Sequence, residues 1–207
     1  MVEVNGIVVL PESKHGSDRY SGIVLGGDRA NVDYWPSNPD GEPLLLVATI
    51  ECALLKKTTA ITALPNTGFL SIFSTYSTTE YFLENITYSG DPSELEAIKA
   101  GYTAVVFSEG EAQQSSPVSS VPVTVTRLEN REVSEDAFPV FSLCSSTPPN
   151  GLEVPADIAN EYEFVLQLYS ADFPDPFKDI FYLSDALGYL FLNKNGSGEG
   201  LFFVQSA

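Results

Sequence analysis

Residues 44–50 read LLLVATI, an apolar run that begins directly after Pro43. Apolar side chains at consecutive positions fit a strand that is buried on both faces. The stretch therefore predicts a central β-strand. Residues 69–76 read FLSIFSTY and follow a turn at residues 64–68. They predict a second strand, because Phe, Ile and Tyr favour a pleated surface.

Other segments repeat this strand signal along the chain. Residues 121–128 alternate apolar and polar side chains, and Pro122 predicts that this strand lies near an edge of the sheet. Residues 92–99 predict a short helix, with Asp91 as its N-cap and Gly101 as its stop. Strands are further predicted at 102–107, 164–169, 187–192 and 200–204, the last two joined by a hairpin at 195–198.

These elements predict an α+β fold dominated by strands, in a single domain over residues 1–207. A chain of this length can bury about 70% of its unfolded surface, so it needs no metal or disulfide. Residues 46–50 and 68–70 form a strand–spacer–strand unit that residues 165–168 and 188–190 repeat weakly. The repeat favours an internal duplication, with halves near 22–130 and 150–207 and a linker near 145–151. The alternative is chance similarity between strand-rich segments.

The charge balance is strongly negative, with 28 Asp and Glu against 10 Lys and Arg and a formal charge of −18. Nucleic-acid backbones and anionic membranes repel such a surface, so neither is an expected partner. A basic protein is the expected partner, because long-range attraction accelerates association. The alternative is that the acidic residues only keep the protein in solution.

The sequence predicts a cytoplasmic protein. The longest apolar run covers only residues 44–48, far fewer than the roughly 20 needed to span a bilayer. The first residues, MVEVNG, lack the basic and apolar regions of a secretory signal. Cys52 and Cys144 each lie in an apolar stretch, so we expect two buried thiols, with a disulfide as the alternative.

The residue types needed for catalysis or metal binding are sparse. His15 is the only histidine, and it lies in a polar segment typical of a solvated side chain. Two distant cysteines and one histidine do not form a zinc site, and the acidic residues lack the spacing of a calcium loop. The glycines at 196–200 are not followed by the Lys of a phosphate-binding loop. We therefore expect no enzyme activity, no cofactor and no metal.

The acidic residues concentrate in the last third of the chain. Eleven acidic residues and a single basic one, Lys178, lie between positions 132 and 191. Within this region, residues 169–179 read YSADFPDPFKD and combine acids, aromatics and two prolines that stiffen the chain. Aromatic anchors surrounded by carboxylates suit a basic protein cleft. The candidate partner-binding residues are Glu161, Glu163, Asp172, Phe173, Asp175, Phe177, Asp179 and Asp185.

The alternative interpretation is that Phe173 and Phe177 fold back onto the core while the acidic side chains face water.

Several motifs occur in an ordered set: GG at 26–27, WP at 35–36, DGEPL at 40–44 and LPNTGFLSIF at 64–73. This set resembles the YwqG-like bacterial family, clearly over residues 22–76 and more weakly over 160–207. The resemblance implies a strand-dominated fold with internal duplication and no known reaction. It also makes an antitoxin-like role plausible. The chain departs from the family pattern at 56–59, where Lys-Lys-Thr-Thr replaces a Leu-Pro-rich stretch.

Two functions from different classes fit these observations. The first is an immunity-type inhibitor, whose acidic face occupies the cationic active site of a toxin or secreted effector. The second is a cytoplasmic scaffold or small-ligand-binding domain, in which the Trp35 loop and the two halves frame a groove. An enzyme is a third and weaker interpretation.

Overall fold

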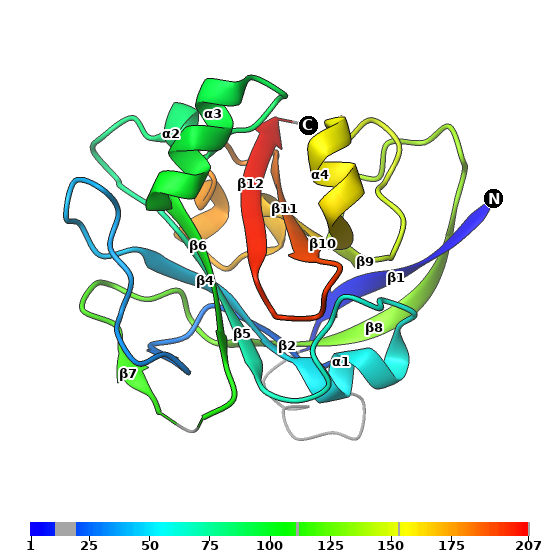
Figure 1. Cartoon of the computed structure of the whole chain (residues 1–207), viewed down its shortest axis with the longest axis horizontal. Helices are drawn as coiled ribbons and strands as arrows, with labels where there is room; N and C mark the ends of the chain where they lie inside the picture. The colour runs from blue at the N-terminus through cyan, green and yellow to red at the C-terminus, as the bar shows by residue number, and fades with distance from the viewer. Residues whose placement is uncertain (11–19, 111, 153, 207) are drawn as a thin grey trace.

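The computed structural model describes residues 1–10, 20–110, 112–152 and 154–206 (Figure 1). His15, the expected solvated histidine, lies outside these residues. The strands are β1 (Val2–Val9), β2 (Ile23–Leu25), β3 (Arg29–Ala30), β4 (Leu45–Glu51), β5 (Phe69–Ser74), β6 (Thr103–Ser108), β7 (Gln114–Ser115), β8 (Thr124–Val133), β9 (Leu143–Cys144), β10 (Tyr162–Tyr169), β11 (Ala186–Asn193) and β12 (Gly200–Ser206). The helices are α1 (Cys52–Thr58), α2 (Leu83–Ile86), α3 (Pro92–Ala97), η2 (Ile98–Tyr102), α4 (Ala156–Glu161), η3 (Ser170–Asp172) and η4 (Phe177–Asp179).

Ten strands form one antiparallel sheet in the order β12-β11-β10-β9-β1-β8-β2-β4-β5-β6, and β3 pairs separately with β7. The sheet curls until its outermost strands, β12 and β6, face each other (Figure 1). Thr103 on β6 joins them, because its Oγ1 donates a hydrogen bond to the carbonyl oxygen of Phe202 on β12. The result is a nearly closed, strand-dominated fold.

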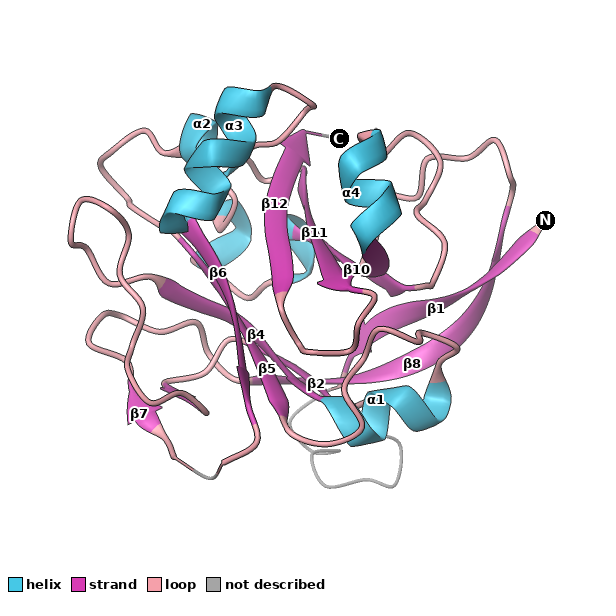
Figure 2. Ribbon diagram, viewed as in Figure 1, coloured by secondary structure: helices cyan, strands magenta, loops and turns pink. Residues whose placement is uncertain are grey.

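Alternation along the strands divides the apolar side chains between two cores. On β11, Leu190 and Leu192 point into the curled sheet, whereas Tyr189 and Phe191 point outward. The outward side chains are covered by helices: Leu95 of α3 and Ile158 of α4 belong to the same cluster. Figure 2 shows α3 and α4 on either side of β12. The sheet therefore carries apolar residues on both faces, as the run at 44–50 predicts.

A β-bulge interrupts that alternation in β4 and again in β10. The register shifts between Leu46 and Ala48 in β4, and between Phe164 and Leu166 in β10. The extra residue lets two consecutive side chains face the inner core, as Val47 and Ala48 do in β4. The predicted buried strands at 44–50 and 164–169 are thus confirmed, each with a bulge that the sequence pattern does not indicate.

The predicted helix near residue 92 is also confirmed. Asp91 accepts a hydrogen bond from the Ser93 N–H at 2.8 Å, which satisfies one of the free donors at the start of α3. At the other end Gly101 has φ 111°, a conformation that favours glycine, and the chain turns into β6. This turn places Tyr102 at the mouth of a cleft described below.

The structure corrects one expectation and adds two elements that the sequence pattern did not predict. β8 lies inside the sheet between β1 and β2, not near an edge, because Pro122 precedes its first residue and removes no ladder donor. The sequence pattern also missed β1, where Asn5 and Gly6 interrupt the apolar residues. It missed α1 as well, which begins after Glu51 without a side-chain cap.

Trp35 anchors the loop before β4, as its place between turn residues predicts. Its ring packs edge-on against Phe73 with centroids 5.2 Å apart, and its Nε1–H donates to the Leu44 carbonyl at 2.8 Å. Cys52 and Cys144 are both buried free thiols, so the expected disulfide-free state is confirmed. Across the described residues, no helix is long and apolar enough to cross a membrane.

Candidate functional site

The predicted partner-binding residues fall into two groups, one at each end of β10. Glu161 and Glu163 lie at the beginning of the strand, whereas Asp172, Asp175 and the later acidic residues follow its end. The eight residues of β10 span about 23 Å, and this distance separates the two groups of acidic residues. The structure therefore does not bring all eight residues together.

Phe173 and Phe177 are not surface anchors, and this part of the prediction is wrong. Their side chains are 1% and 6% exposed and belong to the inner core. Phe173 packs edge-on against Phe181, with centroids 5.8 Å apart. The physical reason is hydrophobic burial. The turns after β10 fold back onto the curled sheet, and burying the two large rings in the inner core stabilises this arrangement.

Two of the predicted carboxylates hold the fold together. Glu163 accepts hydrogen bonds from the N–H groups of Thr62 and Ala63, the latter at 2.7 Å. Asp172 accepts one from the Ser142 N–H at 3.1 Å. These carboxylates satisfy backbone donors of distant loops. By contrast, Asp175 and Asp185 are exposed.

Asp179 lies beside a cavity that the sequence analysis did not predict. The Tyr76 hydroxyl donates to Asp179 Oδ1 at 3.2 Å, and the Tyr76 ring packs against Phe177 and Phe82. Burial, and next the charge of Asp179, raise the pKa of Tyr76. Tyr76 thus connects the acidic turn after β10 to the segment between β5 and α2.

That cavity, which we call the acidic cleft, has a volume of about 300 Å³. It is lined by the loop before β4, by the segment joining β5 to α2, and by Tyr102 at the end of η2. The loop before β4 lies at the left of Figure 1. Asn38 and several small polar residues line it together with three carboxylates and three aromatic rings. The carboxylates are Asp40, Glu42 and Glu80, and the aromatic rings are Tyr81, Phe82 and Tyr102.

Asn38 fixes the loop that carries two of the carboxylates. Its buried side chain accepts hydrogen bonds from the N–H groups of Asp40 and Glu42, and its Nδ2 donates to Glu42 Oε2 at 3.0 Å. Across the cleft, the Tyr102 hydroxyl donates to Asp40 Oδ2 at 3.0 Å. This hydrogen bond is the main cause that raises the pKa of Tyr102. Hydrogen bonds within the molecule therefore hold the Asp40 and Glu42 carboxylates in place.

Exposed tyrosines form the rim of the acidic cleft. Tyr81 is 55% exposed and Tyr182 is 39% exposed. Tyr182 stands edge-on to both Tyr81 and Phe82, with centroids 4.9 Å and 5.4 Å apart. Its φ of 72° is unusual for a residue other than glycine, so the surrounding packing holds it there. Tyrosines with one apolar side and one wet side are typical of protein-binding surfaces.

Among the residues that the structure describes, no basic side chain neutralises the charge of the acidic cleft. No basic residue of the described chain lines it, and none of its carboxylates takes part in an ion pair there. The ion pairs between side chains instead join Glu129 to Arg127 and Arg131 on β8. Within the described residues, no group of three His, Cys, Asp or Glu side chains could hold a metal ion. The acidic cleft therefore presents unpaired negative charge at this part of the described chain.

None of the predicted residues lines the cleft. Asp179 comes nearest, because it accepts a hydrogen bond from Tyr76, whose ring packs against Phe82 of the lining. Asp40 and Glu80 are far apart in the chain and meet because the loop before β4 flanks the segment after β5. One signal was present: the DGEP turn at 40–43, which also carries the family resemblance, supplies two of the three carboxylates.

Comparisons with known proteins place the chain in a family without assigning it an activity. The curated proteins gave no match to this sequence. A family model described as a domain of unknown function, DUF1963, matches residues 27–178. The matched stretch contains the whole acidic cleft apart from the neighbouring Tyr182. Because it covers well over half of the sequence, the chain belongs to the DUF1963 family.

Proposed function

We propose that this protein is a binding domain without enzymatic activity that recognises a cationic segment of another protein at the acidic cleft. One observation carries the proposal. Asp40, Glu42 and Glu80 line the same cavity as an exposed tyrosine, and no basic residue of the described chain lines it with them. This refines the expectation of a basic partner, because it moves the docking site from the turns after β10 to the cleft beside them.

The chemistry of the cleft fits lysine or arginine side chains. Carboxylates form charge-assisted hydrogen bonds with both, and a tyrosine face within about 6 Å of the cation adds about 0.5–1 kcal/mol at an exposed site. The formal charge of −18 gives long-range attraction as well. Association should therefore be fast at low ionic strength and should slow as salt is added.

The finer proposal is an immunity-type inhibitor, whose partner is a toxin or secreted effector with a cationic active site. The unpaired acidic cleft supports it, since occupying a cationic site requires concentrated negative charge. Its specific test is co-expression of the captured partner with and without this protein. Growth should be restored only when the protein has an intact cleft.

The experiment uses two variants with the same change in net charge. The cleft variant carries Asp40→Asn, Glu42→Gln and Glu80→Gln, which keep hydrogen-bonding oxygens. The control carries Glu96→Gln, Glu109→Gln and Asp157→Asn, three exposed acidic residues that do not line the cleft. Tagged proteins capture partners from a lysate of the source cells, and stopped-flow kinetics then measure association of the purified partner.

We expect the cleft variant to associate about tenfold more slowly at low salt and to lose most of the salt dependence. The control variant should behave nearly as the parent protein does. Equal slowing in both variants would mean that only total charge matters, and would contradict recognition at the cleft. A captured partner that binds the cleft variant at the parent's rate would contradict it as well.

The YwqG-like identity and the internal duplication are further proposals about this fold. The strand order supports a duplication, because β9-β10-β11-β12 on one side of β1 and β8 mirrors β2-β4-β5-β6 on the other. The bulges support it too: Phe164 follows Leu46 by 118 positions, and Phe191 follows its counterpart Phe73 by the same 118. The proposed halves are then β1–β6 and β8–β12.

A further inference from the structure

β1 is paired along its whole length on one side but only briefly on the other. It pairs with β8 from Val2 to Val9, and with β9 only at Asn5 and Gly6. The Ile7 N–H donates to the Ser142 carbonyl at 2.8 Å, so Ile7 directs its backbone groups to the β9 side. By alternation, Glu3 directs its N–H and C=O to that side too, beyond the end of β9.

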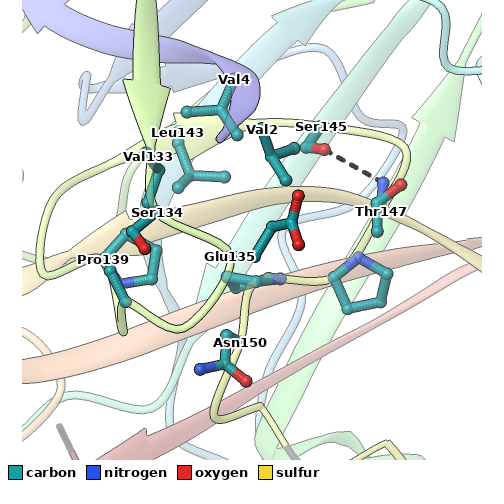
Figure 3. A pocket seen from close by; sticks show the side chains of 13 residues that line it. Val2, Val4, Val133, Ser134, Glu135, Pro139, Leu143, Ser145, Thr147 and Asn150 are labelled. Carbon is teal, nitrogen blue, oxygen red and sulfur yellow. Dashed lines mark hydrogen bonds between the residues drawn. The ribbon is translucent and has the colours of Figure 1, made fainter.

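A mostly apolar cavity of about 280 Å³, which we call the β1 groove, opens where β9 ends (Figure 3). Val2, Val4 and Leu143 share one face of the sheet and line the groove. Its walls come from the loops after β8 and β9, including Ala137 and Pro148. The expected linker near 145–151 therefore forms one wall of this groove.

One charged side chain lines the groove within the described residues, and it is acidic. Glu135 lies among the lining side chains in Figure 3, and its Oε1 is 3.3 Å from the amino group of Met1. Its position shows that an ammonium group fits beside the groove. Glu132 and Asp136 are exposed acidic neighbours in sequence, whereas the guanidinium of Arg131, opposite Val4 on β8, lies over the Phe141 ring. A basic residue is thus the complementary neighbour for an apolar side chain bound here.

We propose that the β1 groove binds an extended segment of a partner protein, which adds to β1 as an antiparallel strand. The unpaired backbone of Glu3 supplies the hydrogen bonds, as in other proteins that recognise a peptide by adding a strand to an open sheet edge. The groove is smaller than most small-molecule pockets, so it suits one or two side chains of a peptide. Glu135 selects a segment with a lysine beside its apolar residues.

The geometry fixes which atoms of the peptide matter. In an antiparallel pair, the residue opposite Glu3 exchanges both backbone hydrogen bonds with it. The two residues flanking that position lie opposite Val2 and Val4, and their side chains face the groove. The proposed peptide motif is therefore three residues long, with apolar residues at its first and third positions, any residue between them, and a lysine next to one of its ends. The N-terminal end of β1 lies at the right of Figure 1, whereas the loop before β4, which carries Asp40 and Glu42 of the acidic cleft, lies at the left, so this binding is separate from the proposed function.

The test uses a synthetic pentapeptide, acetyl-Lys-Val-Thr-Val-Lys-amide, with the full chain labelled with nitrogen-15 for NMR. We expect shift changes at Val2, Glu3, Val4 and residues 143–150, and slower hydrogen exchange at the Glu3 amide. Methylating the threonine amide nitrogen should weaken binding at least tenfold, because that N–H pairs with the Glu3 carbonyl. Methylating the first valine amide, which points away from β1, should change affinity less than twofold.

Protein variants give a second, independent readout. Ala137→Phe should fill the groove and abolish the shift changes, while Glu135→Gln should weaken binding severalfold and reduce its salt dependence. Gly41→Ala, in an open turn far from the groove, serves as the control and should bind the peptide as the parent does. No shift change at 1 mM peptide would overturn the proposal. Equal binding of the two methylated peptides, or shifts that spare Glu3, would overturn it too.

Discussion

Thr103 and Phe202 connect the two strands at which the curled sheet nearly closes, because the buried Thr103 hydroxyl donates to the Phe202 carbonyl. The sheet order gives β6 and β12 no ladder pairing with each other, so this side-chain bond joins them. We expect Thr103→Val, which keeps the shape and removes the donor, to lower the free energy of unfolding by about 1–2 kcal/mol. Urea denaturation measures this. Thr103→Ser keeps the hydroxyl and should lower the free energy of unfolding by less.

Gly68 is expected to be far less tolerant of a side chain than Gly41, although both have φ near +85°. A Cβ at Gly68 would lie 2.6 Å from the Ser108 carbonyl oxygen, whereas Gly41 has open space around it. Gly41→Ala should cost about 1 kcal/mol for the backbone conformation alone, and Gly68→Ala about 2–4 kcal/mol. Thermal unfolding compares them. Equal losses of stability in the two variants would contradict the close approach of the Ser108 carbonyl to Gly68.

The two cysteines should react slowly with thiol reagents in the folded protein. Burial raises the pKa of the Cys52 thiol to about 12, and burial raises the pKa of Cys144 as well. A raised pKa leaves less thiolate, about one part in 10⁴ at pH 8 for Cys52, and the thiolate is the reactive form. Labelling with a chromogenic disulfide should detect both thiols rapidly only in denaturant. Rapid reaction of either one in the native protein would contradict their burial.

Tyr189 and Gln167 face each other on β11 and β10 and should respond oppositely to removal of their polar groups. The Tyr189 hydroxyl is buried and has no hydrogen-bond partner among the described residues. Tyr189→Phe should therefore leave stability unchanged or raise it by up to about 1 kcal/mol. Gln167 donates to the carbonyls of Pro139 and Phe141, at 2.7 Å and 2.8 Å. Gln167→Leu should lower stability by about 2–3 kcal/mol in the same urea titration.

The sequence predicted strands that are buried on both faces and also strands that are partly exposed. Residues 44–50, apolar except for Thr49, and residues 187–192 each became a buried strand, and residues 121–128 overlap the partly exposed β8. β1 was missed because Asn5 and Gly6 divide its apolar residues, and β9 pairs with only these two residues of the strand. The edge position assigned to residues 121–128 failed because sheet order depends on long-range pairing, which no local pattern records.

The candidate site was predicted less well than the fold, for a related reason. Local composition identified an acidic segment after β10, and Asp179 within it contacts Tyr76, which packs against Phe82 of the acidic cleft. Asp40 and Glu80 come from other loops, and only the folded chain brings them together. Composition also could not distinguish Phe173, which packs inside, from Tyr182, which lies at the surface, because both are aromatic residues in an acidic segment.

The order of the strands also determines how the chain can be divided. β1 lies against β9, and β8 lies against β2, so each proposed half gives its first strand to the sheet of the other. The halves are interlocked: a polypeptide that ends after β6 lacks the neighbour that β2 needs, and its complement lacks the neighbour that β9 needs. Two such fragments would hold their native shape only as a heterodimer, assembled through the crossing of β1 and β8.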